Sequence, residues 1–309
     1  MKPLRTAIIG FGKIAADQHV PAIEANPRFE LVGSVSRQGH GPAPNFTSHT
    51  DLLGAGLDLD CAAITTPPGP RYEIARECIE AGLHLLLEKP PTVTLGEMEE
   101  LEALAQAKGV TLFTTWHAQA NPAVTAAAAL LKGQRVAEMQ IVWHEDVHKW
   151  HPGQQWVWEP GGFGVFDPGI NAFSIAVAIF PASLFVQEAV LRVPENAQTP
   201  IAAELTLASP AADGPLGCDL DWRKTDGESW TITVRTADGR TVELRDGGAT
   251  LLVDGTEQQV SGLPEYPHLY RQFADLIDCR QSHVDVRPLR LVADAMLVGR
   301  REVVDAVTT

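Results

Sequence analysis

Three polar side chains have types and positions that suit the binding of a polar ligand, and two of them are ionisable. Lys89 follows the apolar run Leu85–Leu87, and two prolines then stop that strand. Ligands in open α/β sheets bind outside the carboxyl ends of the strands, so an ammonium there would face a ligand crevice. Asp167 and Asn171 are four residues apart, which places both on one face of a helix. A lysine in a surface turn is the simpler interpretation of Lys89, and the surrounding elements have to decide between the two.

The sequence around Asp167 predicts the start of a helix. Asp is a favoured N-cap and Pro168 suits the first helical position, so we expect the helix to begin at Asp167 and to continue through Ala178. The Asp167 carboxylate and the Asn171 amide could then converge on one ligand, although a capping aspartate beside a solvated asparagine would give the same pattern. Asn171 cannot take up a proton at neutral pH, so its amide could bind a ligand but could not act as a base.

The segment from Asp146 to Glu159 is unusually aromatic. It holds three of the seven tryptophans and two of the ten histidines. Aromatic faces pack against the CH groups of a sugar, while carboxylates and imidazoles bind its hydroxyl groups. We therefore predict substrate contacts from Glu145, Trp150 and His151, with His117 as a further candidate. A hydrophobic loop packed under a sheet is the alternative interpretation.

A dinucleotide-binding turn is predicted near the start of the chain. A β-prone run at residues 6–9 precedes the G-x-G-x-x-A pattern Gly10-Phe11-Gly12-Lys13-Ile14-Ala15. Gly10 permits a tight turn, Gly12 lets the backbone approach a pyrophosphate, and small Ala15 lets the following helix pack closely on the sheet. We expect that helix at residues 16–25, with its N-terminus toward the phosphates. An incidental glycine turn is the alternative.

The end of the second predicted strand, Phe29–Val35, indicates the choice of cofactor. An NAD-preferring site usually has Asp or Glu there to bind the ribose 2′-hydroxyl. This chain has Ser36-Arg37, and a hydroxyl beside a guanidinium fork suits a 2′-phosphate. We expect NADP to be preferred and NAD to be usable, because Arg can also stack on adenine; an arginine solvated in a turn is the alternative. The full set of expected cofactor contacts is Gly10, Phe11, Gly12, Lys13, Ile14, Ser36, Arg37, Thr65, Thr66, Pro67, Glu88, Lys89 and Trp116.

The elements that must position these residues alternate between strand and helix in the first third of the chain. This alternation predicts an α/β fold with a doubly wound parallel sheet, including strands at 58–64, 85–87 and 110–115 and helices at 71–81 and 95–108. The last third predicts an antiparallel sheet, with short strands at 201–207, 217–222, 230–236, 241–244 and 250–253. Gly/Asp hairpin turns separate them at 237–240 and 245–248. Closing helices are expected at 265–279 and 289–301, and we assign them no chemistry.

Composition excludes several classes of partner. The 309 residues carry a formal net charge of −15, which argues against nucleic acid and against anionic membrane surfaces. The four scattered cysteines lack metal-type spacing, so we expect reduced thiols and no metal site. The start at Met1 shows no signal peptide, and the apolar helix candidate at 172–180 is too short to span a bilayer. We therefore expect a cytoplasmic protein.

The glycine-rich start, Glu88-Lys89-Pro90 and the length of the chain resemble the Gfo/Idh/MocA family of sugar oxidoreductases. The resemblance covers essentially the whole chain. It implies an NAD(P)-binding Rossmann domain at 1–118 and an α/β domain at 119–309 for substrate binding and oligomerisation, with a large, mostly antiparallel sheet. The last helix could pack back on the first domain, and the free face of the sheet could serve a homo-oligomer. The resemblance also implies that Lys89 touches substrate near the nicotinamide.

One departure from the family pattern indicates which group of enzymes within the family this chain resembles. The family commonly has a histidine acid/base where this chain has Asn171. The runs Gly161–Asn171 and His151–Trp156 are similar to those of bacterial aldose 1-dehydrogenases that act on L-arabinose and D-galactose, which implies oxidation of a pyranose at C1 to a lactone. We assign proton acceptance to Asp167 and binding of O1 to Lys89, although these two roles could be exchanged.

The other predicted residues of the second part would fix the sugar. Asn171, Glu145, His151 and His117 would bind ring hydroxyls. The two sugars differ in one hydroxymethyl group, whose recognition by an apolar pocket is worth only about 1–3 kcal/mol, so the sequence leaves that choice open. A different sugar or polyol oxidoreductase, or a non-catalytic NADP or sugar sensor of the same fold, are the alternatives.

Overall fold

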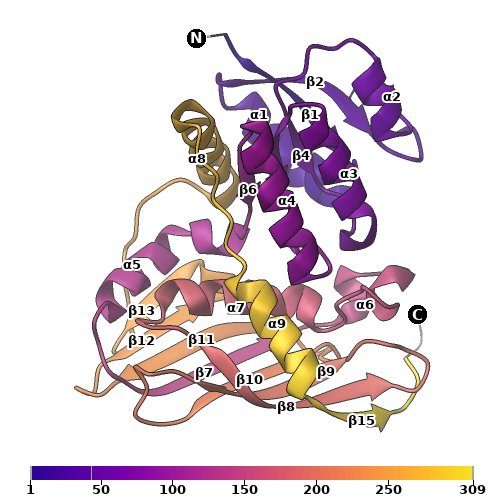
Figure 1. The fold of residues 1–309 in the computed structure, drawn as a ribbon. Coiled ribbons are helices and arrows are strands. Elements are labelled where there is room, and N and C mark those ends of the chain that lie inside the picture. The colour runs from indigo at the N-terminus through magenta and orange to yellow at the C-terminus, as the bar shows by residue number, and fades with distance from the viewer. Residues whose placement is uncertain (1, 43, 308–309) are drawn as a thin grey trace. The chain divides into compact units, whose positions relative to one another are not determined.

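The computed structural model describes residues 2–42 and 44–307. Outside the described residues lie Met1, Ala43, Thr308 and Thr309. The prediction made for the start at Met1 therefore falls partly outside them. The chain divides into two compact units (Figure 1). The first comprises Met1–His117 and Pro264–Val286, and the second comprises Ala118–Leu263 and Arg287–Thr309. Each unit is described by itself.

A six-stranded parallel sheet forms the centre of the first unit, with the strand order β3-β2-β1-β4-β5-β6. Its strands are β1 Leu4–Ile9, β2 Phe29–Val35, β3 Asn45–Phe46, β4 Cys61–Ile64, β5 His84–Leu87 and β6 Leu112–Thr114. All of β4 and most of β1 and β5 are buried, as expected for parallel strands with helices on both faces. The predicted doubly wound sheet is confirmed. The last strand is shorter than expected because the N–H of Thr111 donates to the His84 side chain (2.8 Å).

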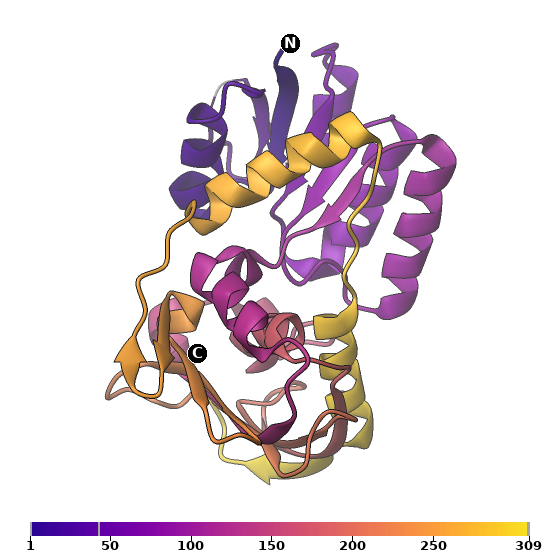
Figure 2. The same ribbon diagram turned by 90° about the vertical axis from the view of Figure 1, so that its left-hand side faces the viewer.

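Helices flank this sheet. They are α1 Val20–Glu24, α2 His49–Gly54, α3 Pro68–Glu80, α4 Leu95–Lys108 and α8 Glu265–Cys279. Side chains of α3 and α4, among them Ile79 and Leu101, pack with β4 and β5 into one apolar cluster. Helix α4 has a capping box between Thr94 and Glu97 and ends at Gly109 in the left-handed conformation. Helix α8 crosses the sheet (Figure 2) although it follows the second unit's strands in the sequence.

The helix after the glycine turn differs from the expected regular helix at 16–25. Residues Ala15–His19 form a π-helical segment that leads into α1, and the N–H of Val20 donates to the carbonyl of Ala15, five residues back. Pro21 has no N–H, and its ring would crowd the carbonyl four residues earlier, which the wider turn relieves. The wide turn carries His19, whose side chain is fully buried.

A nine-stranded sheet forms the second unit, in the order β14-β13-β12-β11-β7-β10-β9-β8-β15. Its strands are β7 Val136–His144, β8 Phe185–Pro194, β9 Ala202–Ala208, β10 Leu216–Asp221, β11 Ser229–Thr236, β12 Thr241–Arg245, β13 Thr250–Val253, β14 Thr256–Glu257 and β15 Arg300–Val304. The pairs β7–β10 and β8–β15 are parallel and the other pairs are antiparallel. The predicted hairpins connect β11 to β12 and β12 to β13, so the mostly antiparallel sheet is confirmed.

Two strands at one end of this sheet were not predicted. Strand β8 alternates buried and exposed positions, which is a strand signal that the sequence analysis passed over. The expected helix at 289–301 is wrong at its end, because α9 spans Arg287–Val298 and β15 follows directly. The β-branched pair Val303-Val304 favours a strand there.

Helices α5 Pro122–Leu131, α7 Phe166–Ile179 and α9 lie on one face of the nine-stranded sheet (Figure 1). The short helix α6 Val147–Trp150 and the 3₁₀ turns at 155–158 and 246–248 complete the unit. The opposite face of β7 and β11 bears polar side chains, including the pair Glu138–Arg235 (2.7 Å). This face is therefore polar, whereas a homo-oligomer contact of the kind we expected would favour a flat apolar surface.

Candidate active site

The predicted phosphate-binding turn connects the carboxyl ends of three strands. Gly10 has φ +102°, and a Cβ added there would lie 2.5 Å from the backbone nitrogen of Thr66 at the end of β4. The N–H groups of Gly10 and Phe11 donate to the carbonyl of Val35 at the end of β2 (3.0 and 2.8 Å). The Thr65 hydroxyl donates to the carbonyl of Gly10 (2.7 Å). Only glycine fits at position 10, because the turn is packed against the next loop.

The same turn leaves room and polar groups for a nucleotide. A Cβ added at Gly12 would meet only the carbonyl oxygen of Gly10, at 4.0 Å. The Thr66 hydroxyl oxygen is buried and has no hydrogen-bond partner in the part of the chain that the structure describes. A buried hydroxyl without a partner costs free energy unless a ligand binds it, so this strand end fits a bound cofactor. Arg37 is exposed beside buried Ser36, while exposed Lys13 pairs with Asp17 on the following turn.

The strand end that carries Lys89 is held by a buried guanidinium. Arg71, at the start of α3, is only 2% exposed, and it donates to the carbonyl oxygens of Thr66, Glu88 and Pro90. These contacts connect the end of β4 to the end of β5. Two of the strand ends with expected cofactor contacts are therefore fixed by one side chain, Arg71, which was not predicted from the sequence.

Glu88 is the centre of a buried hydrogen-bond network. Its carboxylate accepts hydrogen bonds from the Tyr266 hydroxyl (2.7 Å) and from the backbone N–H of Lys89 (2.8 Å), and it contacts Nε2 of His19 (3.2 Å). Nδ1 of His19 lies 2.8 Å from the Tyr270 hydroxyl. Burial raises the pKa of Glu88, but the hydrogen bonds and the charges of nearby histidines outweigh burial and hold that pKa well below its usual range. Glu88 is thus an ionised group that orders the backbone before Lys89.

The two expected residues after β6 have different surroundings. The Trp116 indole is 2% exposed and donates to the carbonyl of Asp285 (2.9 Å), so it packs within the first unit. His117 contacts Glu265 through Nδ1 (2.9 Å), and its ring stacks on Tyr266 at 5.7 Å. Burial lowers the pKa of His117, but Glu265 and then Glu88 more than compensate and raise it above the ordinary value.

In the second unit, α7 begins one residue earlier than predicted, and Asp167 is not its N-cap. The helix starts at Phe166, and the N-cap Val165 makes no side-chain capping bond. The N–H groups of Phe166 and Asp167 donate to the carbonyls of Phe163 and Gly164 (3.1 and 2.9 Å), so the backbone itself satisfies the first turn. Asp167 is therefore inside the first helical turn and not at the N-cap, and it is 4% exposed.

Close packing fixes the first turn of α7 on the sheet. A Cβ added at Gly169 would lie 2.7 Å from Cδ1 of Leu220, a fully buried side chain of β10. One turn after Asp167, the side-chain oxygen of Asn171 is buried and lacks a hydrogen-bond partner within the described residues. A buried amide oxygen without a partner among the described residues, one helix turn from a buried carboxylate, is the feature expected of a site that binds hydroxyl groups.

The predicted sugar-binding residues of the second unit lie in one aromatic cluster. Glu145, which directly follows β7, accepts hydrogen bonds from the indoles of Trp222 and Trp230 (2.9 Å each). The Trp222 ring lies 5.0 Å from that of His151, whose Nε2 is 3.4 Å from Oδ2 of Asp167. The ring of Trp150, 42% exposed, lies 5.6 Å from that of Trp230. Four of these residues were predicted from the sequence, whereas Trp222 and Trp230, which join them, were not.

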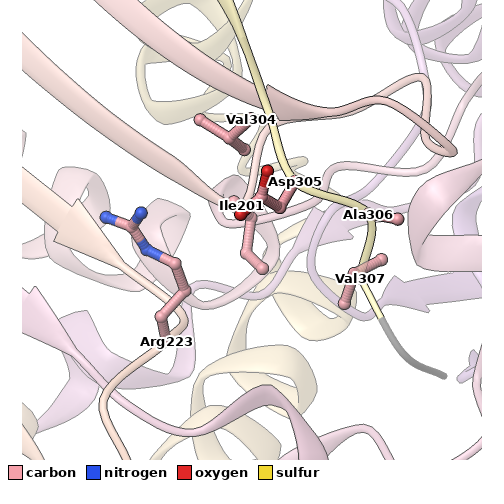
Figure 3. Close-up of a pocket in the computed structure, with 6 residues that line it drawn as sticks. All are labelled: Ile201, Arg223, Val304, Asp305, Ala306 and Val307. Atoms are coloured by element: carbon pink, nitrogen blue, oxygen red, sulfur yellow. The ribbon is translucent and has the colours of Figure 1, made fainter.

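A pocket of about 520 Å³ elsewhere in the second unit involves none of the predicted residues. It is lined by Ile201, Arg223 and the segment 304–307 (Figure 3). Arg223 is paired with Asp221 (2.9 Å) beside it. The described residues hold no cluster of side chains that could bind a metal, and none of their helices has the length and apolarity needed to cross a membrane.

Comparison with known proteins decides the family. Residues 4–116 match the family model Gfo/Idh/MocA, an oxidoreductase family with an NAD-binding Rossmann fold. A galactose 1-dehydrogenase of Pseudomonas fluorescens is 46% identical over 309 residues, which cover 99% of this chain and 99% of that protein. This chain belongs to the Gfo/Idh/MocA oxidoreductase family. The resemblance seen in the sequence is confirmed, and with it the two-sheet α/β fold class.

Solved structures agree with this family assignment. The crystal structure of a D-galactose-1-dehydrogenase from Rhizobium etli superimposes with a TM-score of 0.93 at 44% identity, covering 100% of this chain and 99% of that one. A 3-ketoreductase from Actinomadura kijaniata, crystallised with NADP, has a TM-score of 0.82 over 98% of this chain and 99% of that one. At 19% identity the second likeness shows the fold alone.

Proposed function

We propose that this protein is an aldose 1-dehydrogenase that oxidises C1 of a pyranose, D-galactose or L-arabinose, to the aldonolactone. The observation that carries the proposal is the buried oxygen of Asn171, which has no hydrogen-bond partner among the described residues and lies one turn from the buried carboxylate of Asp167. Two nearly full-length relatives with the name galactose 1-dehydrogenase support the same reaction. The polar groups of the aromatic cluster suit a ligand with several hydroxyl groups.

The proposed roles follow from the chemistry of each side chain. Asp167 accepts the proton of the anomeric hydroxyl, and Lys89 binds O1 and stabilises the negative charge that develops there. Asn171, Glu145, His151 and His117 are the candidate groups for the ring hydroxyls, with Trp150 as an aromatic contact. A nicotinamide cofactor, when bound, supplies the hydride acceptor.

The cofactor would be held by the turn after β1 and the strand ends beside it. The space at Gly12 suits a pyrophosphate, and the buried hydroxyl of Thr66 has no hydrogen-bond partner within residues 2–42 and 44–307. Exposed Arg37 beside Ser36 supports a preference for NADP over NAD. We expect Arg37→Asp to raise KM for NADP by about tenfold or more, since a charge-assisted hydrogen bond is lost, while KM for NAD changes little. An equal effect on both cofactors would contradict the preference.

The test of the activity is a panel of free aldoses with NADP and with NAD, followed by the absorbance of the reduced cofactor. D-Galactose and L-arabinose should be oxidised, and C1-blocked methyl glycosides of both sugars should be inert. Turnover of the methyl glycosides would indicate oxidation at another carbon. Sugar binding without any cofactor reduction would favour the alternative of a non-catalytic sensor of the same fold.

Two further parts of the proposal concern the protein in the cell. The thiols of Cys61, Cys78 and Cys218 are free and buried, which supports a reducing, cytoplasmic location. Self-association through the open face of the nine-stranded sheet would have to use polar contacts, such as those around the pair Glu138–Arg235. Light scattering of the purified protein measures whether it self-associates.

A further inference from the structure

We propose that His151 and Asp167 act as one acceptor for a single proton, so that this pair, rather than Asp167 alone, takes up the proton released from the sugar. The inference rests on the proposed function and assigns to His151 a role other than binding a hydroxyl group. The structure has the His151 imidazole beside the Asp167 carboxylate. One turn further along α7 stands Asn171, whose side chain cannot take up a proton.

The ring of His151 is fixed on several sides. The residue ends the short helix α6, and its backbone N–H donates to the carbonyl of Val147 (2.8 Å). Its ring lies 5.0 Å from the ring of fully buried Trp222 and 6.5 Å from that of Trp156. Nε2 lies 3.4 Å from Oδ2 of Asp167, and the Trp222 indole donates to Glu145 (2.9 Å). The imidazole therefore keeps one defined edge toward the carboxylate.

A neighbouring hydrogen bond determines which nitrogen of His151 carries the proton. The Trp156 indole donates to Oε1 of Gln154 (3.0 Å), and an indole N–H can only donate, so the Gln154 atom must be the amide oxygen. Nδ1 of His151 lies 3.3 Å from this same oxygen, which can only accept. Nδ1 must therefore be the donor. In the neutral ring the lone pair is then on Nε2, the nitrogen that faces Asp167.

The consequence is a pair whose two facing atoms complement each other only when a single proton lies between them. Without that proton, the lone pair of Nε2 and the carboxylate of Asp167 face each other as two acceptors. With it, an imidazolium donates to a carboxylate and both groups are satisfied. Because the two groups interact this closely, the proton belongs to the pair and not to either residue.

The proposed step balances within the dehydrogenase reaction. The C1–H and O1–H bonds of the pyranose break, and a carbonyl forms at C1. The hydride leaves C1 with its electron pair to the nicotinamide cofactor, so the sugar is oxidised and the cofactor is reduced. The O1 proton moves to the Asp167 carboxylate and comes to rest on Nε2 of His151. His151 acts through Asp167, so it is a positioning residue and not a catalytic one.

The first test measures the tautomer of His151 without sugar or cofactor, by ¹⁵N NMR of histidine-labelled protein over a pH range. His151→Asn assigns the signal. We expect Nδ1 to stay protonated throughout, with only Nε2 losing its proton as the pH rises, and Asp167→Asn should lower the pH of that loss. A neutral ring with its proton on Nε2 would overturn the proposal. Gln154→Leu removes the acceptor for Nδ1 and should move the proton to Nε2.

The second test is the pH profile of kcat/KM for aldose oxidation. In the wild type it should rise with pH as the pair loses its proton. His151→Asn should lose this rise and reduce kcat at high pH by about 100-fold or more, with a smaller change in KM, because Asp167 can no longer pass the proton on to an imidazole. His148→Asn, an exposed histidine of the same segment, is the matched control and should behave as the wild type. Gln154→Leu should also reduce kcat if His151→Asn does not fold.

The outcomes separate this inference from the proposed function. A raised KM with an unchanged kcat and pH profile would show that His151 only binds a hydroxyl group, and the proton pair would be wrong while the dehydrogenase stands. If the wild type reduces no cofactor with any aldose, the proposed function fails and the role of the pair in sugar oxidation fails with it. The tautomer measurement would then still decide the local proton arrangement.

Discussion

Glu145→Gln tests the organisation of the aromatic cluster without any assumption about function. Each oxygen of the Glu145 carboxylate accepts one indole N–H, from Trp222 and from Trp230 (2.9 Å each), and Glu145 is 4% exposed. Glutamine keeps the shape but offers only one oxygen, so one indole N–H must face an NH₂ group. Leaving a buried donor without an acceptor costs about 1–3 kcal/mol.

Thermal unfolding followed by circular dichroism measures this cost. A change of 1 kcal/mol shifts Tm by about 2–4 °C in a domain of roughly 150–250 residues, so Glu145→Gln should lower Tm by about 2–12 °C. The matched control is Glu138→Gln on β7, which breaks an exposed pair with Arg235 and should cost no more than about 0.5 kcal/mol.

The comparison has a clear refuting result. If Glu145→Gln is as stable as the wild type while Glu138→Gln behaves as expected, the two indoles do not depend on the carboxylate. The Glu145 carboxylate would then not be what holds Trp222 beside His151. Equal destabilisation by both substitutions would indicate a general effect of lost negative charge and would equally contradict the account.

Two further predictions concern ionisable groups. The pKa of Glu88 is held below its usual range, so its ionised form stabilises the fold at neutral pH, and this contribution is lost as the pH falls from about 4.3 toward the lower folded value. Glu88→Gln should therefore cost about 1–3 kcal/mol in urea unfolding at pH 7 and less at pH 3; an equal cost at both would contradict the ionised network. Burial raises the pKa of Cys61 and of Cys78 to about 12 and that of Cys218 well above its usual value, whereas Cys279 is exposed. A thiol reagent should modify Cys279 alone in the native protein, and modification of a second thiol before unfolding would contradict this burial.

Local signals in the sequence were sufficient for much of the fold. The glycine pattern from Gly10 to Ala15, the strand ends and the Gly/Asp hairpins each depend on a few neighbouring residues, and the structure has these turns where they were predicted. The start of α7 was predicted wrongly because capping by Asp167 competes with backbone turns from Gly164, which the sequence does not reveal. Strand β15 was missed because its pairing with β8 is a contact between distant segments.

In the candidate site, too, residues could be predicted where neighbouring residues in the sequence mark them, and not where the contact joins distant parts of the chain. Single residues such as Lys89, Asp167 and His151 could be named because their types stand out at strand ends and in the aromatic segment. Their partners could not, since Tyr266 and Trp222 come from elements far along the chain. One signal was available: two of the three tyrosines lie four residues apart on the helix at 265–279, which places both on one face.

The most direct test of the central claim uses D-galactose with deuterium at C1. We expect the NADPH formed from NADP to carry the deuterium. Turnover should be slower than for unlabelled sugar when hydride transfer limits the rate. The matched control, D-galactose with deuterium at C2, should give unlabelled reduced cofactor at the normal rate. Label transferred from C2, or no cofactor reduction with D-galactose or L-arabinose, would contradict the assignment of this protein as an aldose 1-dehydrogenase.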